Sequence, residues 1–361
     1  MKKPVVVAMS GGVDSSVAAA LLKNKGYQVI GMTMCFSLPE SRGRRPSCCG
    51  LEGIEDARRV ARELGIKHYV VSMQKYLQDK VIKDFCNEYI LGRTPNPCVR
   101  CNQYLKFDIL LKKAVALGAE FLATGHYARV TSSQGQAAGV KGYILKKAKD
   151  KFKDQSYFLY RLNQEQLKAI LFPLGDYTKT QVRKLAGEFN LPVADKPGSQ
   201  EICFLPDNDY RKFLIARLGN KIKPGPIVNT EGVVLGRHKG IAFYTIGQRE
   251  GLGLALGYPA YIIDINARNN AITVGKKEGV LKNKLLVSQP HFILKPVKKR
   301  IALTVKIRYN HKGALAEVYP IGNKIKVIFK IPQFAVTPGQ SAVFYDKDTL
   351  IGGGIIDKRT D

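Results

Sequence analysis

The chain has 361 residues, of which 45% are hydrophobic and 24% are charged, and this composition excludes a disordered or collagen-like protein. At about 100 to 200 residues per domain, the length predicts two or three domains. Lys and Arg number 58 against 29 Asp and Glu, and the net charge of +29 makes nucleic acid the leading candidate partner. A membrane is disfavoured because no run of about eighteen apolar residues occurs.

Short β-branched runs alternate with amphipathic stretches in the first half of the chain. Strands are expected at 5–9, 28–34, 67–71 and 121–124, and helices at 15–25, 53–64, 107–117 and 179–190. This alternation predicts an α/β domain with a doubly wound parallel sheet, whose ligands bind outside the carboxyl ends of the strands.

The second half of the chain has a different character. Gly and Pro cluster after Asp207, with expected strands at 232–235 and 260–265, and from Leu281 short strands and turns predominate. We therefore predict a catalytic domain at 1–206, a small central β-rich domain at 207–280 and a C-terminal antiparallel β-barrel at 281–361. Between Leu281 and Lys330 stand twelve Lys or Arg residues and one acid, which favours the barrel as a nucleic-acid-binding surface.

A glycine loop follows the first expected strand. Ser10, Gly11 and Gly12 precede Val13 and Asp14, so the order is strand, glycine loop and helix, which is typical of a phosphate site. Asp14 beside phosphate makes sense if Mg²⁺ bridges its carboxylate to a nucleotide. The Gly-Lys-Ser/Thr of a Walker A loop is missing. The alternative is a capped helix in which Ser and Asp merely satisfy first-turn amides.

The string SGGVDSS resembles the PP-loop of ATP pyrophosphatases, which cleave ATP to AMP and pyrophosphate while adenylating a substrate. Met34 and Gly125 lie at the ends of the expected strands 28–34 and 121–124, at the sheet edge where the adenosine should lie, although core packing would explain Met34 as well. The expected ATP-binding residues are Ala8, Met9, Ser10, Gly11, Gly12, Val13, Asp14, Ser15, Met34 and Gly125.

Seven cysteines without a secretory signal argue for a cytoplasmic protein with reactive or metal-binding thiols. Cys98 and Cys101 form a C-x-x-C turn with Arg100 between them, and nearby positive charge activates such thiols. Cys203, in a loop after the last helix of the domain, could close on this pair. Structural zinc is disfavoured because no second C-x-x-C occurs. The other thiols are interpreted as structural or incidental: Cys35, Cys48, Cys49 and Cys86.

Taken together, the strings SGGVDSS, GMTM, PNPCVRCN, LATGHYARV, KDQSYFLY, GSQEICF and YTIGQREGLG resemble the tRNA-specific 2-thiouridylase family over nearly the whole chain. The resemblance implies that ATP adenylates the C2 oxygen of the wobble uridine, after which sulfur replaces that oxygen and AMP leaves. It implies that Cys203 carries a persulfide and that Cys101 acts as the nucleophile, with a Cys101–Cys203 disulfide closing at the end of the cycle. Asp14 would support adenylation.

Cys98 departs from the family pattern, in which many members have Asp. With Cys101 and Cys203 it could instead hold a [4Fe–4S] cluster whose open iron binds sulfide. Both routes need the same thiols, so the sequence leaves the choice between them open.

The resemblance also assigns contacts with tRNA. Asn96 and Pro97, with Cys98, would approach the flipped target base, because C2 is out of reach while the base is stacked. The further expected tRNA contacts are His126, Lys153, Asp154, Gln155, Arg308, Tyr309 and Gln340. Each has a structural alternative: His126 could cap a strand end, Lys153 and Arg308 could be solvated charges, and Tyr309 could fill the barrel.

The expected cofactors are ATP and Mg²⁺, and the expected partners are tRNA and a sulfur donor, either a cysteine desulfurase or a persulfide relay protein. Two other classes compete. A PP-loop amidating synthetase acting on a small metabolite would need neither the basic barrel nor the three cysteines. A non-catalytic RNA-binding protein would not need an intact glycine loop together with Cys101 and Cys203.

Overall fold

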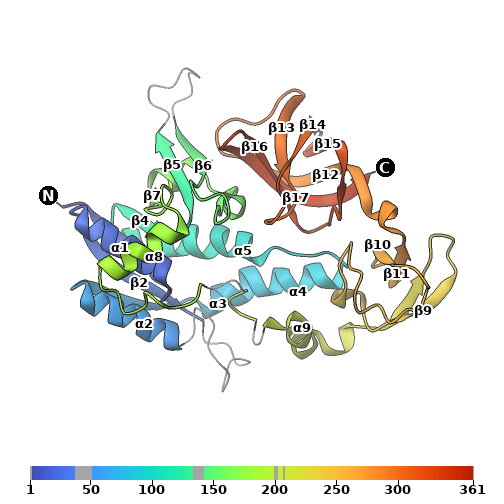
Figure 1. Ribbon diagram of the computed structural model, residues 1–361, viewed down its shortest axis with the longest axis horizontal. Coiled ribbons are helices and arrows are strands. Elements are labelled where there is room, and N and C mark those ends of the chain that lie inside the picture. The colour runs from blue at the N-terminus through green and yellow to red at the C-terminus, as the bar shows by residue number, and fades with distance from the viewer. Residues whose placement is uncertain (1, 37–50, 133–141, 199–201, 206–207, 361) are drawn as a thin grey trace. The chain divides into compact units, whose positions relative to one another are not determined.

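Figure 1 shows the computed structural model of the protein, which describes residues 2–36, 51–132, 142–198, 202–205 and 208–360. These residues form two units. The first consists of 1–81, 98–209 and 348–351, and the second of 82–97, 210–347 and 352–361. Residues 82–97 precede the predicted boundary near Asp207 but pack with the second unit. Cys48 and Cys49 lie outside the described residues.

Five parallel strands form the sheet of the first unit, in the order β3-β2-β1-β4-β7, which confirms the predicted parallel sheet. The central strand β1 pairs with β2 on one side and with β4 on the other, so that Val5 lies between Val29 and Phe121. The strands are β1 (Pro4–Ala8), β2 (Gln28–Cys35), β3 (Lys67–Ser72), β4 (Phe121–Thr124) and β7 (Ile170–Leu171).

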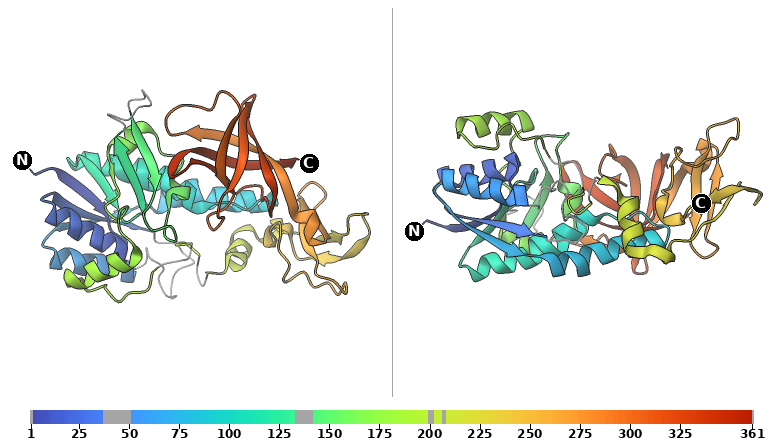
Figure 2. Two further views of the ribbon diagram at one scale, coloured as in Figure 1. Left: turned by 45° about the horizontal axis from the view of Figure 1, so that its top comes forward. Right: turned by 90° about the horizontal axis from the view of Figure 1, so that it is seen from below.

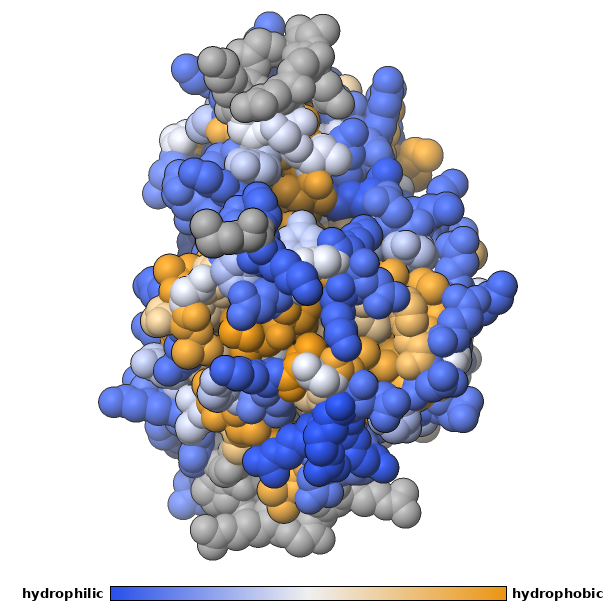
Figure 3. All heavy atoms as spheres, turned by 90° about the vertical axis from the view of Figure 1, so that its left-hand side faces the viewer, coloured by the Kyte–Doolittle hydropathy of each residue, from blue (hydrophilic) through white to orange (hydrophobic). Residues whose placement is uncertain are grey.

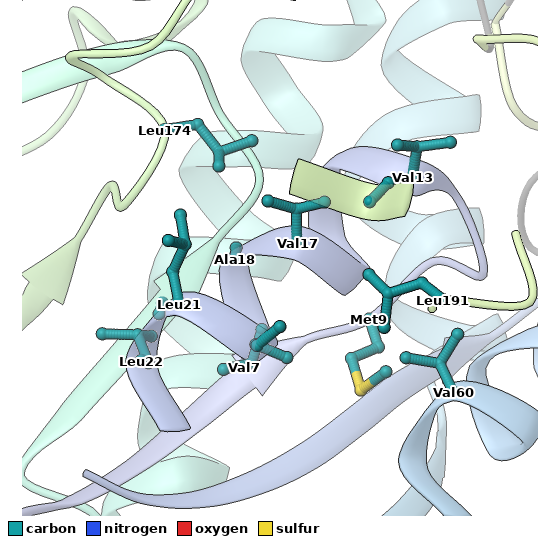
Figure 4. Packing of buried hydrophobic residues seen from close by; sticks show 14 of the residues in the cluster. Val7, Met9, Val13, Val17, Ala18, Leu21, Leu22, Val60, Leu174 and Leu191 are labelled. Carbon is teal, nitrogen blue, oxygen red and sulfur yellow. The ribbon is translucent and has the colours of Figure 1, made fainter. Parts of the chain in front are cut away.

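Both faces of β1 are buried. Val5 and Val7 belong to the core cluster that contains helix α1 (Val13–Asn24), whereas Val6, equally inaccessible, points to the opposite face because side chains alternate along a strand. Figure 4 shows the cluster, with Val17 on α1 and Val60 on a neighbouring helix. The Ala- and Leu-rich sequence of α1 is buried on most sides, which fixes the helix next to the carboxyl end of β1.

The other helical segments of the first unit are mostly short. They are α2 (Leu51–Glu63), α3 (Gln74–Leu77), α5 (Pro97–Arg100), η3 (Cys101–Leu110), α6 (Leu111–Ala116), η4 (Ser156–Leu159), α7 (Gln164–Lys168) and α8 (Lys179–Glu188), and η2 (Gln78–Ile82) leads into the second unit.

The helix expected at 107–117 begins earlier than predicted, and the expectation of a turn at Cys98 and Cys101 is wrong. Pro97 opens the helical turn α5, as proline can at a first helical position, and the chain continues without a break as the π-helix η3 from Cys101. Long π-helical stretches are rare and are associated with functional sites.

Two antiparallel strands, β5 (Ala128–Ser132) and β6 (Tyr143–Lys147), lie between β4 and β7 in the chain. Lys146 of β6 also pairs with Thr349, in the segment 348–351 that returns to this unit from the end of the chain. Arg129 donates to Asp348 at 3.0 Å, which adds an ion pair to this pairing.

The second unit contains two helices and a four-stranded sheet. Phe85 and Tyr89 of α4 (Lys83–Ile90) pack on Phe213 and Tyr210 of α9 (Tyr210–Leu218), and the two tyrosine rings are stacked at 5.1 Å. The sheet has the order β10-β11-β8-β9. Its strands are β8 (Gly225–Val228), β9 (Val234–His238), β10 (Tyr261–Asn266) and β11 (Ala271–Gly275), and the short helical turns are η6 (Gly219–Lys221), η7 (Ile241–Phe243) and η8 (Lys277–Val280).

Six antiparallel strands of the second unit form the predicted barrel, seen in orange and red in Figures 1 and 2. Their order is β12-β15-β14-β13-β16-β17, and β17 pairs back onto β12, so the barrel is closed. Within β15, Lys324 and Lys326 alternate with buried Ile325 and Val327, which turns the basic side chains outward. The strands are β12 (Leu281–Phe292), β13 (Ile301–Lys306), β14 (Ala314–Ile321), β15 (Lys324–Phe334), β16 (Ser341–Asp346) and β17 (Thr349–Thr360).

Among the described residues, no helix has the length and apolar character needed to span a bilayer. On the face of the molecule drawn in Figure 3, hydrophilic side chains surround a group of apolar ones.

Candidate active site

The loop between β1 and α1 is shaped by glycine. Gly11 has φ +75°, a conformation that favours glycine, and a Cβ atom there would overlap the carbonyl oxygen of Gly53 in α2. Gly12 is the N-cap of α1. The backbone of the loop is therefore packed against α2 at a point where no side chain fits.

No side chain caps the N-terminus of α1, so the interpretation of Ser and Asp as helix caps is wrong for the described structure. The Ser15 hydroxyl instead donates to the carbonyl oxygen of Gly12 at 3.1 Å and accepts from the Ser10 amide at 3.1 Å. Ser16 likewise donates to Gly12 at 2.9 Å. These bonds hold the loop in shape and leave the first-turn amides of a twelve-residue helix open to an anion.

Asp14 lies at the centre of a polar cluster. Its Oδ1 accepts from the Tyr127 hydroxyl at 2.8 Å and from Lys179 Nζ at 2.6 Å. Burial and the negative charge of Asp14 raise the pKa of Tyr127, so the phenol remains a protonated donor. Oδ2 of Asp14 accepts no bond from any described residue, and a single hard carboxylate oxygen next to phosphate is the chemistry that Mg²⁺ prefers.

Sequence reasoning missed Tyr127 and Lys179. Lys179 is the first residue of α8, after a capping box of Thr178 and Gln181. A cation is unfavourable at a helix N-terminus. The position of Lys179 at the start of an expected helix was therefore the one feature of the sequence that could have pointed to a functional role. The ion pair with Asp14 compensates it and brings a positive charge to the glycine loop.

The remaining residues of the expected nucleotide site also lie around the loop or at strand ends. Gly125, directly after β4, packs on the first turn of α1, because a Cβ atom there would lie 2.8 Å from the Asp14 carbonyl carbon and from the Ser15 nitrogen. Met34 is half-buried near the end of β2. Met9 and Val13 are buried in the core, so they could offer a nucleotide their backbone rather than their side chains.

The expected catalytic cysteines differ in exposure. Cys98 on α5 is exposed, Cys101 at the start of η3 is buried, and Cys203 is half-buried in a turn where the Leu205 amide donates to the Ile202 carbonyl at 3.0 Å. Cys86, expected to be structural, is indeed buried in α4. The closing of the Cys203 segment on Cys101 stays a prediction.

Within the described part of the chain, no three His, Cys, Asp or Glu side chains are grouped closely enough to hold a metal ion. Cys98, Cys101 and Cys203 are all described and do not form such a group in this structure, so a [4Fe–4S] cluster on these three thiolates stays a prediction, as the Cys101–Cys203 disulfide does.

Three of the expected tRNA contacts of the first unit take part in its internal bonding. Asp154 is buried and accepts from the Ala148 amide at 3.0 Å and from the Ser156 hydroxyl at 2.9 Å. Gln155 accepts from the Tyr127 amide at 3.0 Å. His126 is buried, with Nδ1 2.7 Å from the Thr124 hydroxyl, as the strand-end alternative expects.

Lys153, the fourth of them, is half-buried, and its amide donates to Asp150 at 3.1 Å. In the second unit, Asn96 is half-buried and Pro97 is buried. Arg308 donates to the Phe334 carbonyl at 3.0 Å, which ties this cation to the barrel backbone.

Tyr309 is half-buried with Lys306 Nζ 5.7 Å from its ring centroid, so it does not fill the barrel interior. Gln340 bonds to backbone carbonyls of the segment before Asn96. None of these contacts by itself tests binding of tRNA.

Three family models match the chain in succession. A tRNA methyl transferase HUP domain matches residues 3–207, a tRNA methyl transferase PRC-barrel domain matches 211–276, and an aminomethyltransferase β-barrel domain matches 282–356. The fold and the glycine loop are those of an ATP-using HUP-domain protein with two appended β domains.

Curated relatives match over the whole length. The tRNA-specific 2-thiouridylase of Carboxydothermus hydrogenoformans is 51% identical over 99% of this chain and 98% of its own. The corresponding proteins of Caldanaerobacter subterraneus and Clostridium acetobutylicum are 51% and 47% identical, over 98% and 99% of this chain and 98% and 100% of their own. The chain belongs to the tRNA-specific 2-thiouridylase family.

A solved structure of the U34-tRNA thiolase NcsA from Methanococcus maripaludis aligns at 20% identity with a TM-score of 0.33, covering 61% of this chain and 69% of its own. This likeness is too weak to bear on the chemistry.

We expect Gly125→Ala to weaken ATP binding at least roughly tenfold, about 1.4 kcal/mol, because the new methyl group displaces the Asp14–Ser15 backbone. Calorimetric titration with ATP would measure it. Gly187→Ala on α8 is the matched control, since nothing lies within 4 Å of its Cβ position. Equal ATP affinity in the two variants would show that the first turn of α1 does not bind the nucleotide.

The buried imidazole of His126 makes a pH-dependent contribution to stability. Burial and the nearby charge of Lys106 hold the pKa of His126 well below its usual value. As pH falls, the imidazole of the unfolded chain is therefore protonated at a higher pH than that of the folded chain. Below about pH 6.5 the free energy of unfolding consequently decreases by up to about 1.4 kcal/mol per pH unit. Urea unfolding at pH 7.5 and about pH 5.5 should show a smaller loss for His126→Gln than for the wild type. An identical loss would contradict this assignment.

Proposed function

We infer that the protein is a tRNA 2-thiouridylase, and we propose that it replaces the C2 oxygen of the wobble uridine by sulfur in an ATP-dependent reaction. The observation that supports this most strongly is the uncapped first turn of α1 beside Asp14 and Lys179, in a chain whose relatives are 2-thiouridylases over their full length. The domain descriptions that mention methyl transfer each cover part of the chain, so the full-length relatives carry more weight.

Adenylation is the first proposed step. The uridine C2 oxygen attacks the α-phosphorus of ATP, and pyrophosphate leaves with the electrons of the broken P–O bond. The amides of Val13 and Asp14 and the Lys179 ammonium would stabilise the phosphate charges, because fixed dipoles and cations favour a developing anion. Mg²⁺ held by Asp14 would supply further charge neutralisation. The expected nucleotide contacts run from Ala8 to Ser15, with Met34 and Gly125.

Sulfur transfer is the second proposed step. The terminal sulfur of a Cys203 persulfide attacks C2, the C–O bond breaks, and AMP leaves with the former uridine oxygen. Cys101 thiolate then attacks the Cys203 sulfur, which releases thiouridine and forms a Cys101–Cys203 disulfide. A thiol reductant supplies two electrons to restore both thiols, and a persulfide-carrying protein reloads Cys203. This cycle needs no iron, and Cys98 has no step in it.

The proposed tRNA contacts fall on two parts of the chain, the segment around Asn96 and the basic barrel. A net charge of +29 supplies long-range attraction to the phosphate backbone. Asn96 and Pro97 would face the target base, and Arg308 and Tyr309 the tRNA body. An amidating synthetase for a small metabolite would explain neither this charge nor the full-length family membership.

Cys203→Ser should form no thiouridine but still release pyrophosphate in a tRNA-dependent manner, because adenylation precedes the step that needs sulfur. Mass spectrometry of digested tRNA and a pyrophosphate assay measure the two steps. Cys35→Ser is the matched control and should thiolate normally. Thiouridine formed by Cys203→Ser would remove this cysteine from the pathway.

Cys98→Asp separates the two sulfur routes. The persulfide cycle predicts thiolation close to the wild-type rate, since carboxylate at this position leaves Cys101 and Cys203 in place. Loss of thiolation, together with iron and acid-labile sulfide in the anaerobically purified wild type, would favour the cluster instead.

Arg308→Glu should weaken tRNA binding and reduce the slope of log Kd against log salt by about one, as expected for the loss of one phosphate contact. Filter binding at several salt concentrations measures the slope. An unchanged slope would place Arg308 away from the phosphate backbone.

A further inference from the structure

The loop between β15 and β16 holds the chain segment that precedes Cys98. The amide of Thr94 donates to the carbonyl oxygen of Pro338 at 2.9 Å. Gln340 Nε2 donates to the carbonyl oxygens of Thr94 at 3.0 Å and of Pro95 at 3.1 Å. The side-chain amide of Gln340 thus donates to two successive backbone carbonyls. Thr94, Pro95, Pro338 and Gln340 all belong to the second unit.

Glycine is required at the centre of this contact. Gly339 has φ +92°, and a Cβ atom there would lie 2.8 Å from the Thr94 oxygen and 2.9 Å from its nitrogen. Both atoms are backbone, which cannot rotate away as the tip of a side chain can. The two chain segments are therefore in direct backbone contact.

The loop itself is fixed to the barrel. The Gly339 amide donates to the Ile356 carbonyl at 2.8 Å, and the Ile356 amide donates to the Gln340 carbonyl at 2.8 Å. Through these bonds, the position of strand β17 determines the position of the Thr94 and Pro95 backbone.

The neighbouring residues of the segment are anchored as well. Arg93 donates to Glu88 at 2.7 Å and lies 3.4 Å from Asp357 of β17, and all three side chains are mostly buried. The Thr94 hydroxyl lies 3.1 Å from that of Thr245, in the loop between β9 and β10. Two residues after Pro95 the chain enters α5, which carries Cys98 and leads directly into Cys101.

We propose that Gln340 and Gly339 are positioning residues for thiolation: they hold the backbone of Thr94 and Pro95, so that Asn96 and Pro97, the next two residues of the same unit, are correctly placed against the target base. This inference rests on the proposed function. It assigns to the Gln340 amide group a role within the protein, beyond the contact with tRNA that the family resemblance implies.

The test is a comparison of Gln340→Ala and Gln340→Glu with the control Gln333→Ala. Gln333 is half-buried on β15 and bonds to His311 and to its own strand, without contacting residues 93–95. Glu has the shape of Gln but offers carboxylate oxygens to two carbonyls, so it should not rescue the contact.

For both Gln340 variants we expect kcat for thiolation at saturating tRNA to fall about tenfold to a hundredfold, beyond any change in Kd for tRNA, because misplacement by about 1 Å affects the reaction more than binding. Hydrogen exchange at the Thr94 amide should accelerate at least roughly tenfold, since its surroundings open. Gln333→Ala should match the wild type in all three measurements.

A rise in Kd or KM with unchanged kcat would overturn the proposal and make Gln340 an ordinary tRNA contact. A lower melting temperature with unchanged kcat would overturn it in favour of a purely structural bond. If the wild type itself forms no thiouridine, the proposed function fails, and hydrogen exchange at Thr94 still decides whether Gln340 holds this segment.

Discussion

The nucleotide-binding capacity proposed for the first unit depends on the open N-terminus of α1. Gly11 packs against Gly53, and Gly125 against the backbone of Asp14 and Ser15, so the first turn is fixed by backbone contacts and needs no capping side chain. Its amides therefore keep their capacity to bind an anion. A capping side chain would stabilise α1 by about 1 kcal/mol and would occupy the position of the phosphate. The chain stabilises the helix by packing instead and leaves its end available.

Charge around this helix end is balanced by residues from distant parts of the sequence. Asp14 is held by Tyr127, which follows β4, and by Lys179, which begins α8. A carboxylate that accepts from a phenol and from an ammonium is held in a fixed position. The same ammonium lies next to the loop in which phosphate would bind, so its charge can be shared between Asp14 and the nucleotide.

The sequence predicted the parallel sheet and the barrel because both depend on local patterns. In the first half, β-branched runs such as Val5 to Val7 alternate with helical stretches, and in the barrel charged and apolar residues alternate along one strand from Lys324 to Val327. It did not predict the π-helix from Cys101, since hydrophobic periodicity does not distinguish an α-helix from a wider helix. It also did not predict β7, because a strand of two residues is too short to show a pattern. Lys179 and the Gln340 contacts were missed because they join residues 165 and 246 positions apart, and such pairs arise from the fold rather than from spacing. The family resemblance supplied the cysteine roles, which no local pattern specifies.

The central claim is that uridine oxygen leaves as part of AMP. Its most direct test is thiolation of tRNA transcribed with oxygen-18 at the C2 position of uridine, followed by mass spectrometry of the AMP produced. The account predicts one heavy oxygen in AMP for each thiouridine formed, because the C2–O bond breaks after that oxygen has joined the α-phosphorus. Unlabelled AMP, with the heavy oxygen released to water or found in pyrophosphate, would contradict adenylation of the base.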